Sequence, residues 1–208
     1  YNTVNINPAY AGSRGVLSVF GVYRTQWVGL EGAPTTFAAS INSPINNTKI
    51  GLGLSMVKDI IGPSEKNAIS ADFSYTIKTS EVYKLSFGLK TTANLYDVDF
   101  SKLSRYNLSD PKFQYNISNQ FSANIGAGVY LHSDRFYLGA SIPYMLATKH
   151  FDDNASVTAK DVSHIYLIGG YVLNLSSATK FKPAFLVKSV KGAPLQADLS
   201  GTFMFNDK

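Results

Sequence analysis

The side chains that most often perform catalysis are few in this chain and far apart. Its 208 residues include no cysteine and three histidines, His132, His150 and His164. His150 stands with Asp152 and Asp153, a group that in an external loop can bind a cation or, beside a serine, support hydrolysis. No set of nucleophile, base and orienting residue is identifiable, and no Gly-rich phosphate loop is present. The sequence therefore predicts a non-enzymatic protein without cofactor or metal site, and His150 is interpreted as part of a solvated polar loop.

A second group of candidates combines a cation with aromatic side chains. Arg24 lies on the polar face of an alternating segment, where it can contact a ligand or partner, or pair with an interior acid such as Asp72 or Asp198. Pairing is preferred, because the interior of a membrane β-barrel is polar in any case. Tyr10 can belong to a binding surface, although aromatic residues of this kind more often anchor a protein at the membrane interfaces.

Lysines form the third group. Lys180, Lys182 and Lys188 share one face of a segment, and Lys78 and Lys90 lie on the polar faces of two others. With a formal net charge of +5 and a pI near 9.2, a basic interior can pass anions or hold an acidic peptide. Interior lysines with ordinary counter-ions remain the preferred interpretation. Nucleic-acid binding is excluded, because it needs a basic surface with interleaved stacking aromatics on a soluble module.

The composition limits the elements that can position these residues. Hydrophobic residues make up 45% of the chain and charged residues 16%, against about 25% charged residues in soluble domains. Ser, Thr and Asn together supply 51 of the 208 residues (23, 13 and 15). This balance excludes intrinsic disorder, and no run approaches the ~18 apolar residues of a membrane-spanning helix. A soluble all-β protein and a membrane β-barrel remain.

Ten segments alternate between apolar and polar residues with a period of two, which predicts strands with two different faces. In one of them Ile69, Phe73 and Tyr75 lie opposite Ser70 and Ser74. No segment has a helical period, so no major helix is expected. The predicted strands lie near residues 15–29, 35–44, 50–56, 69–78, 85–95, 121–132, 135–146, 163–175, 180–191 and 195–205.

The length of these segments favours a membrane barrel over a soluble sandwich. Many cover about 11–13 residues, whereas strands of soluble sheets most often have about 5–6. Twelve residues at about 3.3 Å each, tilted near 45°, rise roughly 28 Å, close to the thickness of the hydrocarbon layer. We therefore predict an all-β, transmembrane, up-and-down antiparallel β-barrel of the outer-membrane type.

The connections sort by parity, as they do in outer-membrane barrels with short periplasmic turns and long external loops. The odd-numbered connections include the three long ones, 59–67, 97–120 and 147–162, and the even-numbered ones are all tight. The amino terminus is then periplasmic, and 97–120 is the largest external loop. Its aromatic residues are candidate partner-binding anchors, or they fold inward and plug the barrel. They are Phe100, Tyr106, Phe113 and Tyr115.

An ordered series of local sequences carries a likeness across essentially the whole chain, and no single motif among them is specific. The series includes Asn7-Pro8-Ala9-Tyr10-Ala11-Gly12, Tyr23-Arg24-Thr25-Gln26-Trp27, Asp110-Pro111-Lys112-Phe113 and Gly192-Ala193-Pro194. Together they resemble the PorP/SprF family of Bacteroidetes outer-membrane proteins.

The resemblance implies a multi-pass outer-membrane component of type IX secretion and gliding machinery that binds and helps to export or anchor a surface adhesin with a type B C-terminal signal. Implied partners are the adhesin or its C-terminal domain, other type IX or gliding components including periplasmic lipoproteins, and outer-membrane lipid. Tyr10 and its neighbours would meet the periplasmic machinery.

The family barrel is longer than this chain. Residues 1–208 are therefore expected to be one barrel domain that lacks its C-terminal strands, from a complete barrel of roughly 12–16 strands. The alternative function is an outer-membrane porin or solute channel, for which a polar, glycine-rich inner face is equally good evidence.

Overall fold

The computed structural model describes residues 2–103, 116–146 and 162–206. Within these ranges the chain is almost entirely antiparallel β-sheet, as predicted. The only helical elements described are three single turns, α1 (Thr3–Ile6), η1 (Pro8–Tyr10) and η2 (Phe100–Lys102). None of the described helices is long and apolar enough to cross a membrane. The strands are β1 (Ser18–Thr25), β2 (Thr35–Pro44), β3 (Ile50–Ile61), β4 (Ser64–Lys78), β5 (Lys84–Val98), β6 (Ile117–His132), β7 (Phe136–Ile142), β8 (His164–Tyr171), β9 (Leu173–Asn174), β10 (Thr179–Val190) and β11 (Gln196–Phe205).

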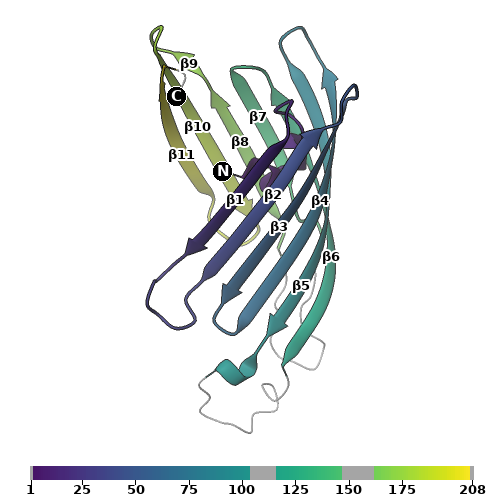
Figure 1. Cartoon of the computed structure of the whole chain (residues 1–208), viewed down its shortest axis with the longest axis vertical. Coiled ribbons are helices and arrows are strands. Elements are labelled where there is room, and N and C mark those ends of the chain that lie inside the picture. The colour runs from purple at the N-terminus through teal and green to yellow at the C-terminus, as the bar shows by residue number, and fades with distance from the viewer. Residues whose placement is uncertain (1, 104–115, 147–161, 207–208) are drawn as a thin grey trace.

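The strands form one up-and-down sheet in which neighbours in sequence are neighbours in space. The order is β1 to β8, then β10 and β11, and the short β9 pairs with β10. The sheet is tilted and curved into the wall of a barrel (Figure 1). It is not closed, since among the described residues β1 pairs with β2 alone and β11 with β10 alone. The architecture is that of part of an outer-membrane β-barrel.

The burial pattern is inverted relative to a soluble protein. In β4 the polar Ser70, Asp72 and Ser74 are buried on the concave inner face, whereas Phe73 on the outer face is 42% exposed. In the same way Phe87 of β5 is 48% exposed and the alternate polar residues of that strand are buried. A surface of large exposed apolar side chains around a polar interior is what a lipid-facing barrel presents. The two faces therefore follow the predicted alternation.

The connections divide between two ends of the barrel (Figure 1). We call the end with the connections 45–49, 79–83, 133–135 and 175–178 the turn end. The opposite end, with the connections 26–34, 62–63, 99–116, 143–163 and 191–195, is the loop end. The even-numbered connections are short, as predicted. The two longest connections are odd-numbered, also as predicted, although β5 continues to Val98 and β6 already begins at Ile117.

The predicted long loop at 59–67 is wrong. β3 and β4 pair up to Ile61 and Ser64, which leaves Gly62 and Pro63 as a tight turn with Gly62 at a φ of +57°. The charged residues of this stretch lie in the ladder, where Lys58 forms an ion pair with Glu65 at 2.6 Å. Opposite charges on adjacent strands stabilise a sheet, so charge alone does not mark a loop.

Three other boundaries differ from the predicted ones. The strand expected at 135–146 ends at Ile142, because Pro143 has no N–H to donate to a ladder. The chain then turns over the inner face, where the Asn124 side-chain oxygen accepts hydrogen bonds from the backbone nitrogens of Met145 and Leu146, both at 3.0 Å. The strand expected at 163–175 is divided at residue 172 into β8 and β9. The first strand, expected at 15–29, covers only Ser18–Thr25.

Candidate functional site

The inner face of the sheet is occupied by the start of the chain. Residues 2–12, which we call the N-terminal plug, contain α1 and η1 and lie inside the curve of the sheet (Figure 1). Within the plug Val4, Asn7 and Ala9 are at most 1% exposed. The sequence reasoning did not place this segment in the interior.

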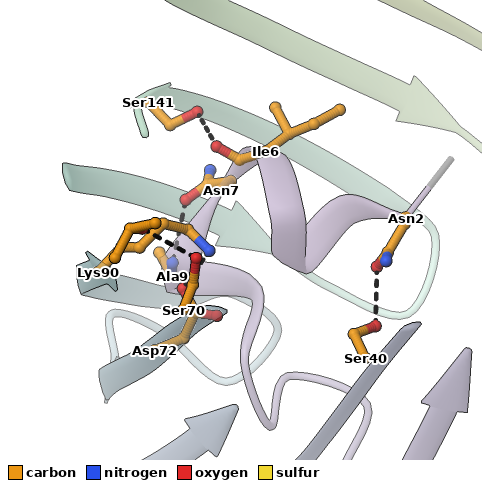
Figure 2. A network of polar contacts seen from close by, with 10 residues as sticks. Asn2, Ile6, Asn7, Ala9, Ser40, Ser70, Asp72, Lys90 and Ser141 are labelled. Carbon is orange, nitrogen blue, oxygen red and sulfur yellow. Dashed lines mark hydrogen bonds and ion pairs between the residues drawn. The ribbon is translucent and has the colours of Figure 1, made fainter. Parts of the chain in front are cut away.

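Hydrogen bonds fasten the plug to strands on both sides of it (Figure 2). The Ser74 hydroxyl on β4 donates to the backbone oxygen of Ala11 at 2.6 Å. On β7 the Ser141 hydroxyl donates to the backbone oxygen of Ile6 at 2.9 Å. Asn7 donates from Nδ2 to the backbone oxygen of Val129 at 2.9 Å and accepts at Oδ1 from the Ala9 nitrogen at 3.0 Å. Backbone oxygens and the Asn7 side chain of the plug are thus matched by polar groups of the wall.

Glycines on the inner face make room for this contact. A Cβ atom at Gly51 would collide with the backbone of Ala11, and one at Gly88 with the backbone of Ala9. A Cβ at Gly128 would collide with the Asn7 side chain. Glycine inside a strand often marks a place where another backbone approaches closely. The inner-face glycines are therefore the sequence signal from which a plug could have been inferred.

An apolar cluster completes the contact on the other side of the plug. Ala9 packs with Tyr130, Ile168 and Leu186, all less than 8% exposed. Tyr10 packs against the same cluster, with its ring edge-on to Tyr130 at 5.5 Å between centroids. These inner-face side chains of β6, β8 and β10 are apolar because the plug, and not water, covers them.

A buried ion pair lies beside the plug (Figure 2). The Lys90 ammonium of β5 is 2.8 Å from Asp72 of β4, and the two side chains are 2% and 0% exposed. Two residues along the strands on the same face, the Ser70 and Thr92 hydroxyls share a hydrogen bond of 2.8 Å. Asp72 is thereby committed to Lys90, so it is not the interior partner considered for Arg24.

Arg24 lies near the loop end of β1, opposite Thr36 on β2, and is exposed. Thr36 donates a hydrogen bond to Asp59 on β3. Asp198, the other acid considered for Arg24, lies on β11 at the far edge of the sheet. Arg24 and the partly buried Tyr10 belong to different regions, and the structure does not bring them together.

Of the aromatic anchors predicted in the large loop, Phe100 lies in η2 directly after β5. Asp99 caps this turn and accepts hydrogen bonds from the Ser101 hydroxyl at 2.6 Å and from the Asn116 amide at 3.1 Å. These hydrogen bonds, that from the Ser101 hydroxyl above all, hold the pKa of Asp99 below its usual value. Asp99 thus ties the two ends of the loop together. Tyr106, Phe113 and Tyr115 lie outside the described residues.

The described residues contain no group of three or more His, Asp or Glu side chains placed to hold a metal ion. His132 is on β6 at the turn end and His164 on β8 at the loop end, so they do not form a site together. What the interior offers is a set of backbone and side-chain contacts to a polypeptide segment. Such an interior is suited to holding polypeptide.

Comparison with known proteins gives one match. No curated protein and no solved structure matches the chain. The family model for the type IX secretion system membrane protein PorP/SprF matches residues 1–208. The antiparallel sheet with a polar inner face and an apolar outer face is consistent with a membrane protein of this kind. The chain therefore belongs to the PorP/SprF family of type IX secretion system membrane proteins.

Proposed function

We propose that this protein is a non-enzymatic outer-membrane component that binds a secreted surface adhesin carrying a type B C-terminal signal and helps to export or anchor it. The observation that carries the proposal is the N-terminal plug. A solute channel needs a continuous polar passage, whereas this inner face is covered from β4 to β10 by residues 2–12. An anchoring barrel has no need of such a passage.

The contacts between the plug and the sheet support the interpretation that the plug stays in place inside the barrel. Hydrogen bonds reach it from β4 and β7, buried glycines on β3 and β5 fit its backbone closely, and Gly128 on β6 leaves room for the Asn7 side chain. Buried hydrogen bonds of this kind rigidify a structure. A plug held in this way favours a barrel that works through stable partners over one that works through flux.

The proposed partners would meet the protein at its two ends. The loop end carries the large connection that contains Phe100, Tyr106, Phe113 and Tyr115, and aromatic side chains often provide interface anchors. We propose that this end is external and meets the adhesin. The turn end would then face the periplasm and the other components of the secretion and gliding machinery, including periplasmic lipoproteins.

Deletion of the gene tests the proposal. One or more adhesins should disappear from the cell surface, as measured by mass spectrometry of surface-labelled proteins, while uptake of small hydrophilic solutes stays nearly unchanged. Complementation with the intact gene is the control. If deletion slowed solute uptake and left every surface protein in place, the protein would be a porin and the proposal would be wrong.

A further inference from the structure

A cationic pocket opens at the turn end of the barrel, beside the point where the N-terminal plug leaves the interior. Its volume is about 390 Å³, within the range of pockets that bind small ligands or short segments. The wall includes Ala11, Gly12 and Ser13 from the chain after η1, together with residues from the ends of β2 to β6. Its charged and ionisable lining residues are Lys49, Lys78, Lys84 and His132.

The sheet register places these cations side by side. Lys78 on β4 lies directly opposite Lys84 on β5, and Lys84 lies directly opposite His132 on β6. Like charges directly opposite each other destabilise a sheet. Lys49 adds a third ammonium from the connection before β3. This arrangement costs the fold stability, in contrast to the neighbouring Lys90, which has Asp72 as a partner.

The pocket also lacks the counter-charges that would satisfy it. Neither Asp nor Glu is among the described residues that line it. Glu81 and Asp134 lie in the turns after β4 and β6 and are not part of its wall, although Asp134 interacts electrostatically with His132. None of the three lysines forms an ion pair with a described residue. His132 is stacked on Tyr130, and its buried Nε2 has no hydrogen-bond partner in the described part of the chain.

We infer that this pocket is a binding site for a carboxylate-rich peptide segment of a partner protein. Three ammonium groups in one pocket provide charge-assisted contacts to several carboxylate oxygens at once. The inference deepens the proposed function, because it assigns to the turn end the chemistry of the partner that the barrel holds there.

The position of the pocket favours a peptide over a lipid headgroup. Thr76, Lys78 and Gly51 share the inner face of the sheet, which faces away from the exposed apolar side chains of the outer surface. A phospholipid in the surrounding bilayer lies against the outer face. A polypeptide can enter from the mouth of the barrel, as the N-terminal plug of this chain does.

A binding measurement on the purified full-length barrel in nanodiscs tests the inference. The probe is a short fluorescent peptide rich in Asp and Glu, with the matching Asn- and Gln-rich peptide for comparison, read by fluorescence anisotropy. We expect the acidic peptide alone to bind, and its affinity to fall about tenfold or more in the variant K49Q/K78Q/K84Q, because three charge-assisted contacts are lost. The variant K182Q/K188Q/K191Q is the control: it removes the same charge from β10 and its following turn, and it should bind normally.

Two further measurements separate the outcomes. In the absence of peptide the K49Q/K78Q/K84Q barrel should unfold at a higher urea concentration than the wild type, since like-charge repulsion is relieved. Inorganic phosphate and vesicles containing phosphatidylglycerol should compete only weakly with the peptide. Equal binding by the triple variant, equal loss in the control variant, a less stable triple variant, or tighter binding of phosphate or anionic vesicles would each overturn the inference. Because this is a direct binding assay, its failure is distinguishable from a failure of the proposed function, which surface proteomics tests.

Discussion

Among the ion pairs of the described residues, Asp72–Lys90 is the most deeply buried. Its side chains are almost completely excluded from solvent, so each charge depends on the other for compensation. It also couples β4 to β5 next to the plug, where Gly88 makes room for Ala9. Loss of one partner leaves an uncompensated charge beside the plug.

We therefore expect Asp72→Asn to lower the free energy of unfolding by about 3–5 kcal/mol, and the double variant D72N/K90M to lose less than either single variant. Urea unfolding of the barrel in lipid vesicles measures these changes. The control is the pair Lys58–Glu65, whose side chains are both 35% exposed. Its disruption by Glu65→Gln should cost at most about 1 kcal/mol, because solvent screens the pair. A D72N effect no larger than that of E65Q would contradict the buried role.

At the scale of the strands, alternation predicted the two faces of β4 and β5 correctly, because lipid and lumen favour side chains of opposite polarity at successive residues. The demand is strongest in the middle of a strand. Leu89 on β5 lies opposite Phe73 on β4 and is 62% exposed on the outer face. A charge at this position would have to enter the hydrocarbon layer.

We expect Leu89→Arg to destabilise the folded barrel by about 2–4 kcal/mol, the cost of an arginine near the bilayer midplane. Equilibrium folding into lipid vesicles measures it. The matched control is Leu103→Arg, since Leu103 follows η2 at the loop end and is exposed outside the strands. That change should stay within about 0.5 kcal/mol of the wild type. Equal effects at the two positions would mean that the outer face of β5 does not contact lipid.

Element boundaries were predicted less well than faces, and for identifiable reasons. The stretch 59–67 was predicted as a loop because the alternation used for the two strands covers only 50–56 and 69–78, whereas charged residues such as Lys58 and Glu65 pair across the ends of these strands. The expected seventh strand was too long because the apolar Met145 and Leu146 follow Pro143, and their backbone nitrogens are bound by Asn124 over the inner face. The period-two alternation of the sequence contains no information about the Lys58–Glu65 ion pair or about the hydrogen bonds of Asn124.

For the whole molecule, the sequence predicted the barrel but not what fills it. The plug is held by contacts more than sixty residues apart along the chain, such as that between Ser74 and Ala11, which no local pattern reveals. The inner-face glycines were a sequence sign of the plug, because they leave room for its close approach. Glycine on the inner face is equally compatible with an open channel, however. The polar, glycine-rich inner face therefore did not distinguish an anchoring barrel from a channel, and only the resemblance to the PorP/SprF family favoured anchoring. Phe100, Arg24 and Tyr10 are placed at separate positions, and a role for them in partner binding stays a prediction.

The central claim is that this barrel holds partners and does not conduct. Planar-bilayer recording of the purified full-length protein tests it most directly. The wild type should give no stable stepwise conductance, and Gly88→Leu, which displaces Ala9 of the plug, should give open-channel steps. Gly21→Leu is the matched control, because a side chain there meets open space, and it should stay closed. Stable, porin-like open channels formed by the wild-type protein would contradict the account.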